Sequence, residues 1–242
     1  MLHSIIMSSS YSSGCRIAMD FYPGEQKVNE FKGAIRKIKE TCGADVSISL
    51  HTLEVSGTAW QDVGKADMFF ADVKLIPALE EFISLIQKDR KLSGWDVAKY
   101  ILSKIKCTHL KLEKLVYLAY ADYLCSTDGK KLFEDKILAY KFGPVVDTVY
   151  TECKKFGYSE IDDRTFSART YAELPIKSRI LFAERGLEKC ISIDKTLEKY
   201  GHFEGGQLID ITHRKGSPWS YTGQSAEISD DDILRYHCKE AI

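Results

Sequence analysis

The segment from Lys111 to Gly157 constrains the fold more than any other part of the sequence. Its first half repeats apolar side chains at the spacing that places them on one face of a helix: Leu112, Leu115, Val116, Ala119 and Tyr123. Thr108 precedes this run and is predicted to cap the helix, because its hydroxyl can accept a hydrogen bond from an amide of the first turn. The polar residues of the run fall outside the apolar stripe and are predicted to be solvated: Lys111, Glu113, Lys114 and Asp122.

The second half of the segment predicts a short extended stretch followed by another helix. After an Asp128-Gly129 turn, large side chains at 138, 140 and 142 alternate with Ala139 and Lys141, as in a strand that packs on one face. Pro144 is predicted to be the first residue of the next helix, because proline has no amide to lose there and its φ already suits a helix. Gly157 is predicted to end that helix.

Three stretches, in this order, resemble the SocA-like (Panacea) antitoxin domain. They are the helix from Lys111-Leu112 to Tyr123, the run YKFGPVV at 140–146 with Tyr150, and Thr212-His213 followed by Ser217-Pro218-Trp219. The family pattern is a KLQKLLYYA-type helix, a WKYGPVVPxVY-type segment and a late TH…PW segment. This chain has Glu113 at the usual glutamine and Tyr140 at the usual tryptophan. The resemblance covers about residues 93–242.

The resemblance implies an antitoxin that neutralises a cognate protein toxin of a bacterial or prophage system by direct binding. It also implies a mainly helical domain and a set of signature residues, any of which is a candidate for contact with the toxin: Lys111, Leu112, Tyr117, Tyr120, Tyr140, Phe142, Gly143, Pro144, Tyr150, His213, Pro218 and Trp219. Two alternatives are an adaptor that delivers the toxin to a protease and an autorepressor that binds DNA. Association with a second copy of this chain, as a homo-oligomer, is also left open.

Two domains are predicted, giving an α+β protein overall. Residues 1–92 are expected to form a small α-β-β-α domain of unknown role, with 1–24 as an irregular arm, a helix at 26–41, strands near 46–55 and 68–76, and a helix from Pro77. Residues 93–242 are expected to form the helical Panacea-type domain. Its first helix starts at a capping box of Ser93 and Asp96, and further helices follow at about 176–187, 188–200, 204–213 and 229–237. The long segment 158–175 is expected to be a loop that contributes to recognition.

Charge and composition argue against some classes of partner. Residues 1–92 hold 11 Lys and Arg against 12 Asp and Glu, and residues 93–242 hold 23 of each, so neither part is basic. Nucleic-acid binding depends on clustered positive charge, and this balance argues against a large binding face. No stretch has the length and apolarity of a membrane span, and the first 15 residues lack the charged start and apolar core of a signal peptide.

Catalytic and metal-binding patterns find little support in the sequence. The seven cysteines are scattered without a CxxC pair or a zinc-type spacing, and they are predicted to be reduced core thiols of a cytoplasmic protein. His213 is interpreted as a structural group at a helix end rather than a metal ligand. We therefore expect no enzyme activity, cofactor or metal, although an active site within the first 92 residues remains an open alternative.

Overall fold

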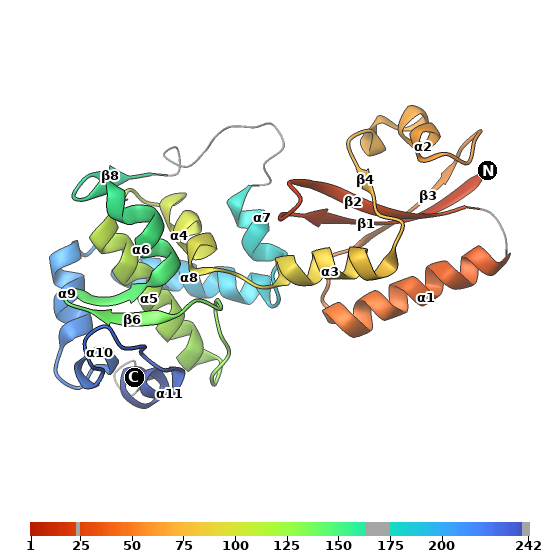
Figure 1. Ribbon diagram of the computed structural model, residues 1–242. Helices are drawn as coiled ribbons and strands as arrows, with labels where there is room; N and C mark the ends of the chain where they lie inside the picture. The colour runs from red at the N-terminus through yellow and green to blue at the C-terminus, as the bar shows by residue number, and fades with distance from the viewer. Residues whose placement is uncertain (23–24, 163–174, 239–242) are drawn as a thin grey trace. The chain divides into compact units, whose positions relative to one another are not determined.

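The computed structural model describes residues 1–22, 25–162 and 175–238, and it divides into two compact units (Figure 1). The first unit comprises Met1–Lys91 with Arg169–Glu184, and the second comprises Leu92–Ala168 with Arg185–Ile242. The first unit contains a small sheet with helices, and the second is mostly helical. The α+β fold class expected from the sequence is confirmed.

A four-stranded sheet with the order β3-β1-β2-β4 forms the centre of the first unit. β1 (Leu2–Ser10) pairs antiparallel with both β2 (Cys15–Phe21) and β3 (Ser49–Glu54), while β4 (Lys74–Leu75) pairs parallel with β2. The prediction of an irregular arm at 1–24 and of an α-β-β-α order is therefore wrong, because the two central strands lie in this region. The predicted strand at 68–76 is also wrong, since it is a short 3-10 turn, η1 (Met68–Phe70), followed by the two residues of β4.

Burial on both faces explains how a serine-rich segment becomes a central strand. Ile6 and Ile17 lie in the cluster on one face of the sheet, and Ile5 and Ala18 lie in the cluster on the other, so the strands lack the alternation of a half-exposed sheet. The serines keep hydrogen bonds inside the fold, because Ser8 Oγ donates to the Ser47 carbonyl at 3.0 Å.

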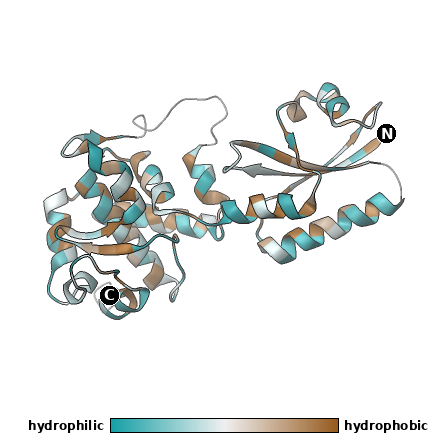
Figure 2. Ribbon diagram, in the orientation of Figure 1, coloured by the Kyte–Doolittle hydropathy of each residue, from teal (hydrophilic) through white to brown (hydrophobic). Residues whose placement is uncertain are grey.

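Helices cover the two faces of this sheet. α1 (Glu25–Cys42) and α3 (Leu79–Arg90) pack on one face, and α2 (Trp60–Ala66) with η1 packs on the other (Figure 1). α1 is largely hydrophilic in Figure 2, and its few buried side chains point to the core: Ala34, Ile38 and Cys42. The helix predicted at 26–41 and the helix predicted from Pro77 are confirmed.

The segment from 175 to 184 belongs to the first unit, although its sequence pattern placed it with residues 93–242. It contains the short helix α7 (Ile176–Leu181). The guanidinium of Arg179 donates hydrogen bonds to the main-chain carbonyls of Asp89 and Lys91, and its side chain is buried. Sequence patterns do not reveal such contacts, because the partners lie about 90 residues apart.

Helix α5 (His109–Ser126) is the central element of the second unit. It contacts α4 (Gly94–Leu102), α6 (Asp147–Cys153), α8 (Gly186–Tyr200), α9 (Gly205–His213) and β7 (Gly143–Val146). Both predicted starts are confirmed: Ser93 and Asp96 form the capping box of α4, and the Thr108 hydroxyl accepts from the Lys111 amide at 3.4 Å. The prediction that Glu113 and Lys114 are solvated is wrong, because α5 is covered on nearly every side and both are buried.

A two-stranded hairpin stands where the sequence predicted a strand followed directly by a helix. β6 (Ile137–Tyr140) pairs antiparallel with β7 (Gly143–Val146), so Pro144 lies in a strand opposite Ala139. Helix α6 then begins at Asp147, and Pro144 at the first helical position is a wrong prediction. Proline is compatible with this strand because the hairpin has only two strands and β7 lies at its edge.

The remaining elements of the second unit are short. β5 (Cys107–Thr108) pairs with β8 (Glu160–Ile161), and η2 (Lys154–Phe156) follows α6. α10 (Pro218–Tyr221), α11 (Asp230–Asp232) and the π-helical turn η4 (Ile233–His237) complete the described chain. The helices predicted at 188–200, 204–213 and 229–237 correspond to α8, α9 and α11 with η4. Most of the predicted 158–175 loop lies outside the described residues.

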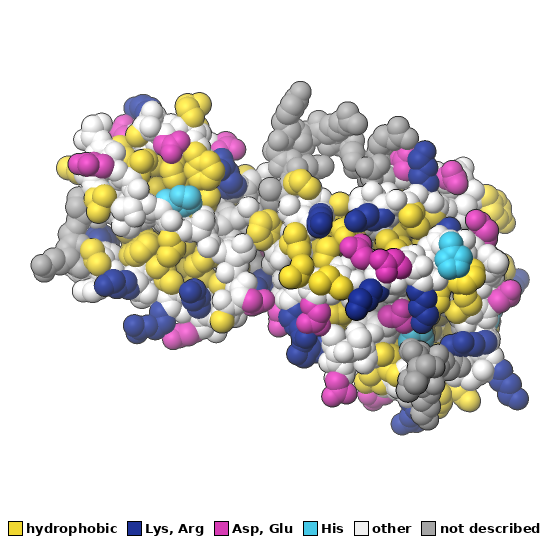
Figure 3. Space-filling view, turned by 180° about the vertical axis from the view of Figure 1, so that it is seen from behind, with side chains coloured by type: hydrophobic (Ala, Val, Ile, Leu, Met, Phe, Trp, Pro, Cys, Tyr) yellow, Lys and Arg dark blue, Asp and Glu magenta, His cyan; other side chains and the backbone are white. Residues whose placement is uncertain are grey.

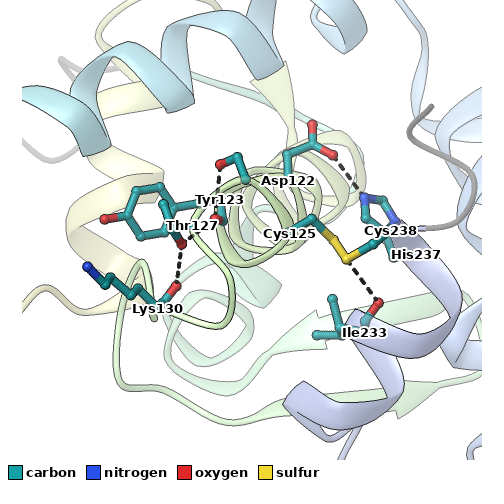
Figure 4. Close-up of a disulfide and its surroundings, with 9 residues drawn as sticks. Asp122, Tyr123, Cys125, Thr127, Lys130, Ile233, His237 and Cys238 are labelled. Atoms are coloured by element: carbon teal, nitrogen blue, oxygen red, sulfur yellow. Dashed lines mark hydrogen bonds and ion pairs between the residues drawn. A yellow bond between two sulfur atoms is a disulfide. The ribbon is translucent and has the colours of Figure 1, made fainter.

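A disulfide joins the end of α5 to the residue after η4 (Figure 4). Cys125 and Cys238 are 113 residues apart in sequence, and their Cα atoms lie 5.4 Å apart. The other five cysteines are free thiols. The prediction that all seven are reduced is therefore wrong for this pair, because only the fold brings the two residues together.

Candidate partner-binding site

A cavity of about 780 Å³ opens on the second unit beside the β6–β7 hairpin. Its wall comes from the start of α5, the hairpin, α6, the segment around Gly157 and helix α9. The cavity is lined by Thr108, His109, Leu110, Glu113, Lys114, Tyr140, Lys141, Phe142, Val145, Tyr150, Lys154, Gly157, Tyr158, Ile209, Gln224 and Ser225. This volume is within the range of sites that hold several side chains or a small ligand.

Aromatic side chains form much of the cavity wall. The rings of Tyr140 and Tyr150 meet edge to face with centroids 5.3 Å apart, and His109 lies 5.5 Å from Tyr150. Phe142 is 57% exposed and Tyr158 is 98% exposed, although both are large aromatic residues. Exposed aromatics beside a concave site are typical of surfaces that bind other proteins.

The floor of the cavity carries a buried carboxyl group. Glu113 Oε2 accepts a hydrogen bond from the Val146 amide at 3.0 Å, and Glu113 Oε1 lies 3.3 Å from His109 Nε2. Burial raises the pKa of Glu113, and the hydrogen bond with His109 opposes that rise. The carboxyl group therefore ties the start of α5 to the end of the hairpin.

Lys114 lies next to Glu113 and is also buried. Its Nζ donates a hydrogen bond to the Pro144 carbonyl at 2.7 Å, which replaces part of the hydration that the ammonium loses. Burial lowers the pKa of Lys114 to about 8, against the opposing influence of Glu113. The two charged residues thus hold opposite ends of β7 against α5.

Gly143 permits the close approach of the hairpin to Lys114. Its φ of +103° is a conformation that side chains disfavour, and an added Cβ would lie 2.9 Å from Lys114 Cε and 3.1 Å from His213 Nε2. We expect Gly143→Ala to lower the free energy of unfolding by about 2 kcal/mol, from backbone strain and from displacement of the buried lysine. Chemical denaturation measures this change.

Gly129→Ala is the matched control for that substitution. Gly129 also has a positive φ, +91°, but an added Cβ would make only an ordinary contact of 3.7 Å. The difference between the two losses of unfolding free energy, Gly143→Ala minus Gly129→Ala, therefore measures the cost of the overlap with Lys114. Equal losses in the two variants would show that Gly143 matters only for its backbone angle.

His213 and Trp219 stack on each other, and Trp219 is hydrogen-bonded to the β6–β7 hairpin. Their rings stack with centroids 3.7 Å apart, and the Trp219 indole donates to the Tyr140 carbonyl at 2.8 Å. Burial lowers the pKa of His213, and the nearby Lys114 lowers it further. The neutral imidazole is thus favoured, although the end of α9 alone would favour a cation.

The structure divides the signature residues named from the sequence into three groups. Tyr140, Phe142 and Tyr150 line the cavity. Four others do not line the cavity: Gly143, His213, Trp219 and the half-buried Lys111. The rest are buried in the core: Leu112, Tyr117, Tyr120, Pro144 and Pro218.

Several lining residues were missed by sequence reasoning. Lys114 and Glu113 were interpreted as solvated because their position on the predicted helix faces away from the apolar stripe. Lys154 falls within the helix that was predicted to run from Pro144 to Gly157, and Tyr158 is the first residue of the predicted 158–175 loop. The sequence did contain a signal that Glu113 contributes to the site. It stands at a position where the family pattern has glutamine, another side chain that accepts hydrogen bonds.

A second cavity, of about 890 Å³, lies between α5 and α8 beside the disulfide. Lys195 and Lys199 line it together with Asp122 and Glu188. Within the described residues, no cluster of three His, Cys, Asp or Glu side chains has the arrangement of a metal site. No helix in the same residues combines the length and apolarity needed to cross a membrane.

Comparisons with known proteins converge on one family. Residues 112–220 match the family model described as "Antitoxin SocA-like, Panacea domain". The chain is also 29% identical over 140 residues to "Antitoxin SocA" of Caulobacter vibrioides (strain NA1000 / CB15N), covering 56% of this chain and 72% of that protein. No solved structure matches. The resemblance stated from the sequence is confirmed.

Proposed function

We propose that this protein is an antitoxin that neutralises a cognate protein toxin by binding it directly, because residues 112–220 match the SocA-like Panacea family model and the chain is similar to an antitoxin. One observation carries the proposal: the matched region contains the floor and the aromatic wall of the cavity, namely Glu113, Lys114, Tyr140 and Tyr150. The protein acts by stoichiometric binding without an enzymatic step. The system that we propose is bacterial or carried by a prophage, with a role in defence against phage.

Occlusion of the toxin is the mechanism that we propose first. The exposed aromatic residues Phe142 and Tyr158 are the residue type that most often carries binding energy in protein interfaces. They project beside a concave site of sufficient volume to receive a side chain of the partner. The alternative is adaptor-assisted proteolysis, in which the protein binds the toxin through the same site and delivers it to a protease.

Co-expression with the product of the neighbouring open reading frame tests the proposal. The neighbour alone is expected to stop growth, and this chain is expected to restore growth and to co-purify with the neighbour. Phe142→Ala combined with Tyr158→Ala is expected to weaken the complex by about 100-fold, from the loss of two aromatic anchors. Leu187→Ala removes another exposed apolar side chain, 67% exposed on α8, and is the matched control.

The outcomes separate the alternatives. Rescue that persists in cells lacking their ATP-dependent proteases supports occlusion, whereas rescue that disappears there identifies the adaptor. Absence of toxicity and of a complex would contradict the antitoxin proposal. Salt-sensitive gel shifts with the operon's promoter DNA would instead favour the autorepressor. On the face shown in Figure 3, positive and negative side chains are interspersed, which gives the autorepressor little support.

The cytoplasm is the location that we propose. The structure holds the Cys125–Cys238 pair as a disulfide, whereas the reducing cytoplasm converts most accessible disulfides to thiols in the cell. Trapping free thiols with N-ethylmaleimide during cell lysis is therefore expected to modify both cysteines, and the bond is expected to form in protein that is purified without reductant. Protection of both cysteines during lysis would contradict the cytoplasmic location.

A further inference from the structure

We infer that the cavity beside the β6–β7 hairpin receives an acidic segment of the partner protein, with an aromatic or large aliphatic side chain inserted between its carboxylates. The inference rests on the proposed function, because it names the chemistry of the toxin segment that the site recognises. Four features of the site carry it: its shape, its apolar wall, the charge of its rim and the state of its floor.

The charge around the cavity is unbalanced. Three lysines line it: Lys114 in the floor, and Lys141 and Lys154, which are exposed at the rim. Among the described lining residues Glu113 is the one carboxylate, and its two oxygens already face the Val146 amide and the His109 ring. An incoming carboxylate therefore meets positive charge at the rim without competition from these lining side chains.

The rim lysines stand close to the aromatic rings that an apolar side chain would contact. Lys141 Nζ lies 5.4 Å from the Phe142 ring centroid, and Lys154 Nζ lies 5.8 Å from that of Tyr150. This arrangement places a cation beside each aromatic surface. In a partner segment that alternates carboxylates with an apolar side chain, the carboxylates would pair with the rim lysines while the apolar side chain contacts the aromatic rings.

The form of the wall favours a peptide over a nucleic acid. Bases bind on flat aromatic faces that they can stack upon. Here Tyr140 and Tyr150 meet at an interplanar angle of 82°, so they enclose a corner. A corner of this kind surrounds an inserted side chain, and the chain's charge of −1 supplies no broad field for a phosphate backbone.

Charge reversal at the rim tests the inference in the complex with the neighbouring gene product. Lys141→Glu combined with Lys154→Glu is expected to weaken that complex by at least about 10-fold at low salt, mainly through slower association. Lys195→Glu combined with Lys199→Glu makes the same charge change at exposed lysines of the second cavity and is the matched control. A complex that forms but loses equal affinity in both variants overturns the inference and leaves the antitoxin proposal intact.

A peptide experiment decides the inference when no complex with the neighbour forms. The probes are acetylated pentapeptides of sequence EDFDE, EDSDE and KRFRK, titrated into the full chain and followed by its amide resonances. EDFDE alone is expected to shift the signals of residues 140–158, and the shifts are expected to disappear in the Lys141→Glu, Lys154→Glu variant. Equal shifts with KRFRK, no shift with any peptide, or displacement of EDFDE by an oligothymidylate would each overturn it.

Discussion

Reduction of the Cys125–Cys238 disulfide is expected to lower the free energy of unfolding of the second unit by about 2–5 kcal/mol. The bond closes a loop of 113 residues, which contains the β6–β7 hairpin, α8 and α9. Because a long closed loop restricts the unfolded chain most, reduction stabilises the unfolded state more than it disturbs the folded one. Thermal unfolding with and without dithiothreitol measures the difference.

Non-covalent contacts are expected to keep the same fold after reduction. Asp122 Oδ1 lies 2.8 Å from His237 Nε2 beside the disulfide (Figure 4). The His237 ring also contacts the ring of Tyr117. The reduced protein should therefore keep its far-ultraviolet circular dichroism at 25 °C while its melting temperature falls by roughly 2–4 °C per kcal/mol. This separates loss of the crosslink from loss of structure.

Thiol counting and two variants control this prediction. In denaturant without reductant, five of the seven cysteines are expected to react, and all seven after reduction. Cys238→Ser is expected to abolish the effect of dithiothreitol on stability, whereas Cys15→Ser, at a free cysteine, is expected to preserve it. Seven reactive thiols in the unreduced protein would contradict the disulfide.

The buried ammonium of Lys114 is expected to make stability rise between about pH 8 and pH 10.5. Its pKa is lowered from 10.5 to about 8 in the folded protein, so across that window the unfolded state binds more protons. Below this window the lysine is protonated in both states, and the cost of burying its charge is on the order of 3 kcal/mol. Above it the lysine is neutral in both states and the cost is gone.

Comparison with Lys114→Met isolates this contribution. Other groups titrate in the same range, so the expected result is a wild-type curve that rises relative to the variant's as pH increases, measured by urea denaturation at each pH. Lys111→Met removes a half-buried lysine from the same helix and controls for the loss of one positive charge. Parallel curves for wild type and Lys114→Met would show that the ammonium is not desolvated.

Glu113→Gln tests the electrostatic part of the same prediction. The substitution keeps an acceptor for the Val146 amide but removes the charge that raises the pKa of Lys114. The rise in stability is therefore expected to begin at lower pH in this variant. His213 also faces Lys114, and its pKa is lowered, so its neutral form adds no positive charge in this range.

Local sequence determined the elements whose signals lie within a few residues. The Thr108 cap and the Ser93–Asp96 capping box formed as predicted, because both partners of each hydrogen bond are three residues apart. The order of three short motifs was likewise sufficient to recognise the resemblance to the Panacea domain, whose family model matches residues 112–220, because that order is a property of the chain and does not depend on packing. The aromatic members of the site, Tyr140, Phe142 and Tyr150, were named for the same reason.

Tertiary structure decided everything that depends on which surfaces are covered. Residues 5–6 and 17–18 became central strands because helices bury both faces of their sheet, and Pro144 entered a hairpin because β6 was available to pair with it. Glu113 and Lys114 have the local pattern of a solvated helix face, yet the hairpin covers them and changes their pKa values. The Cys125–Cys238 bond likewise depends on a contact across 113 residues, a distance at which no helical or strand period operates.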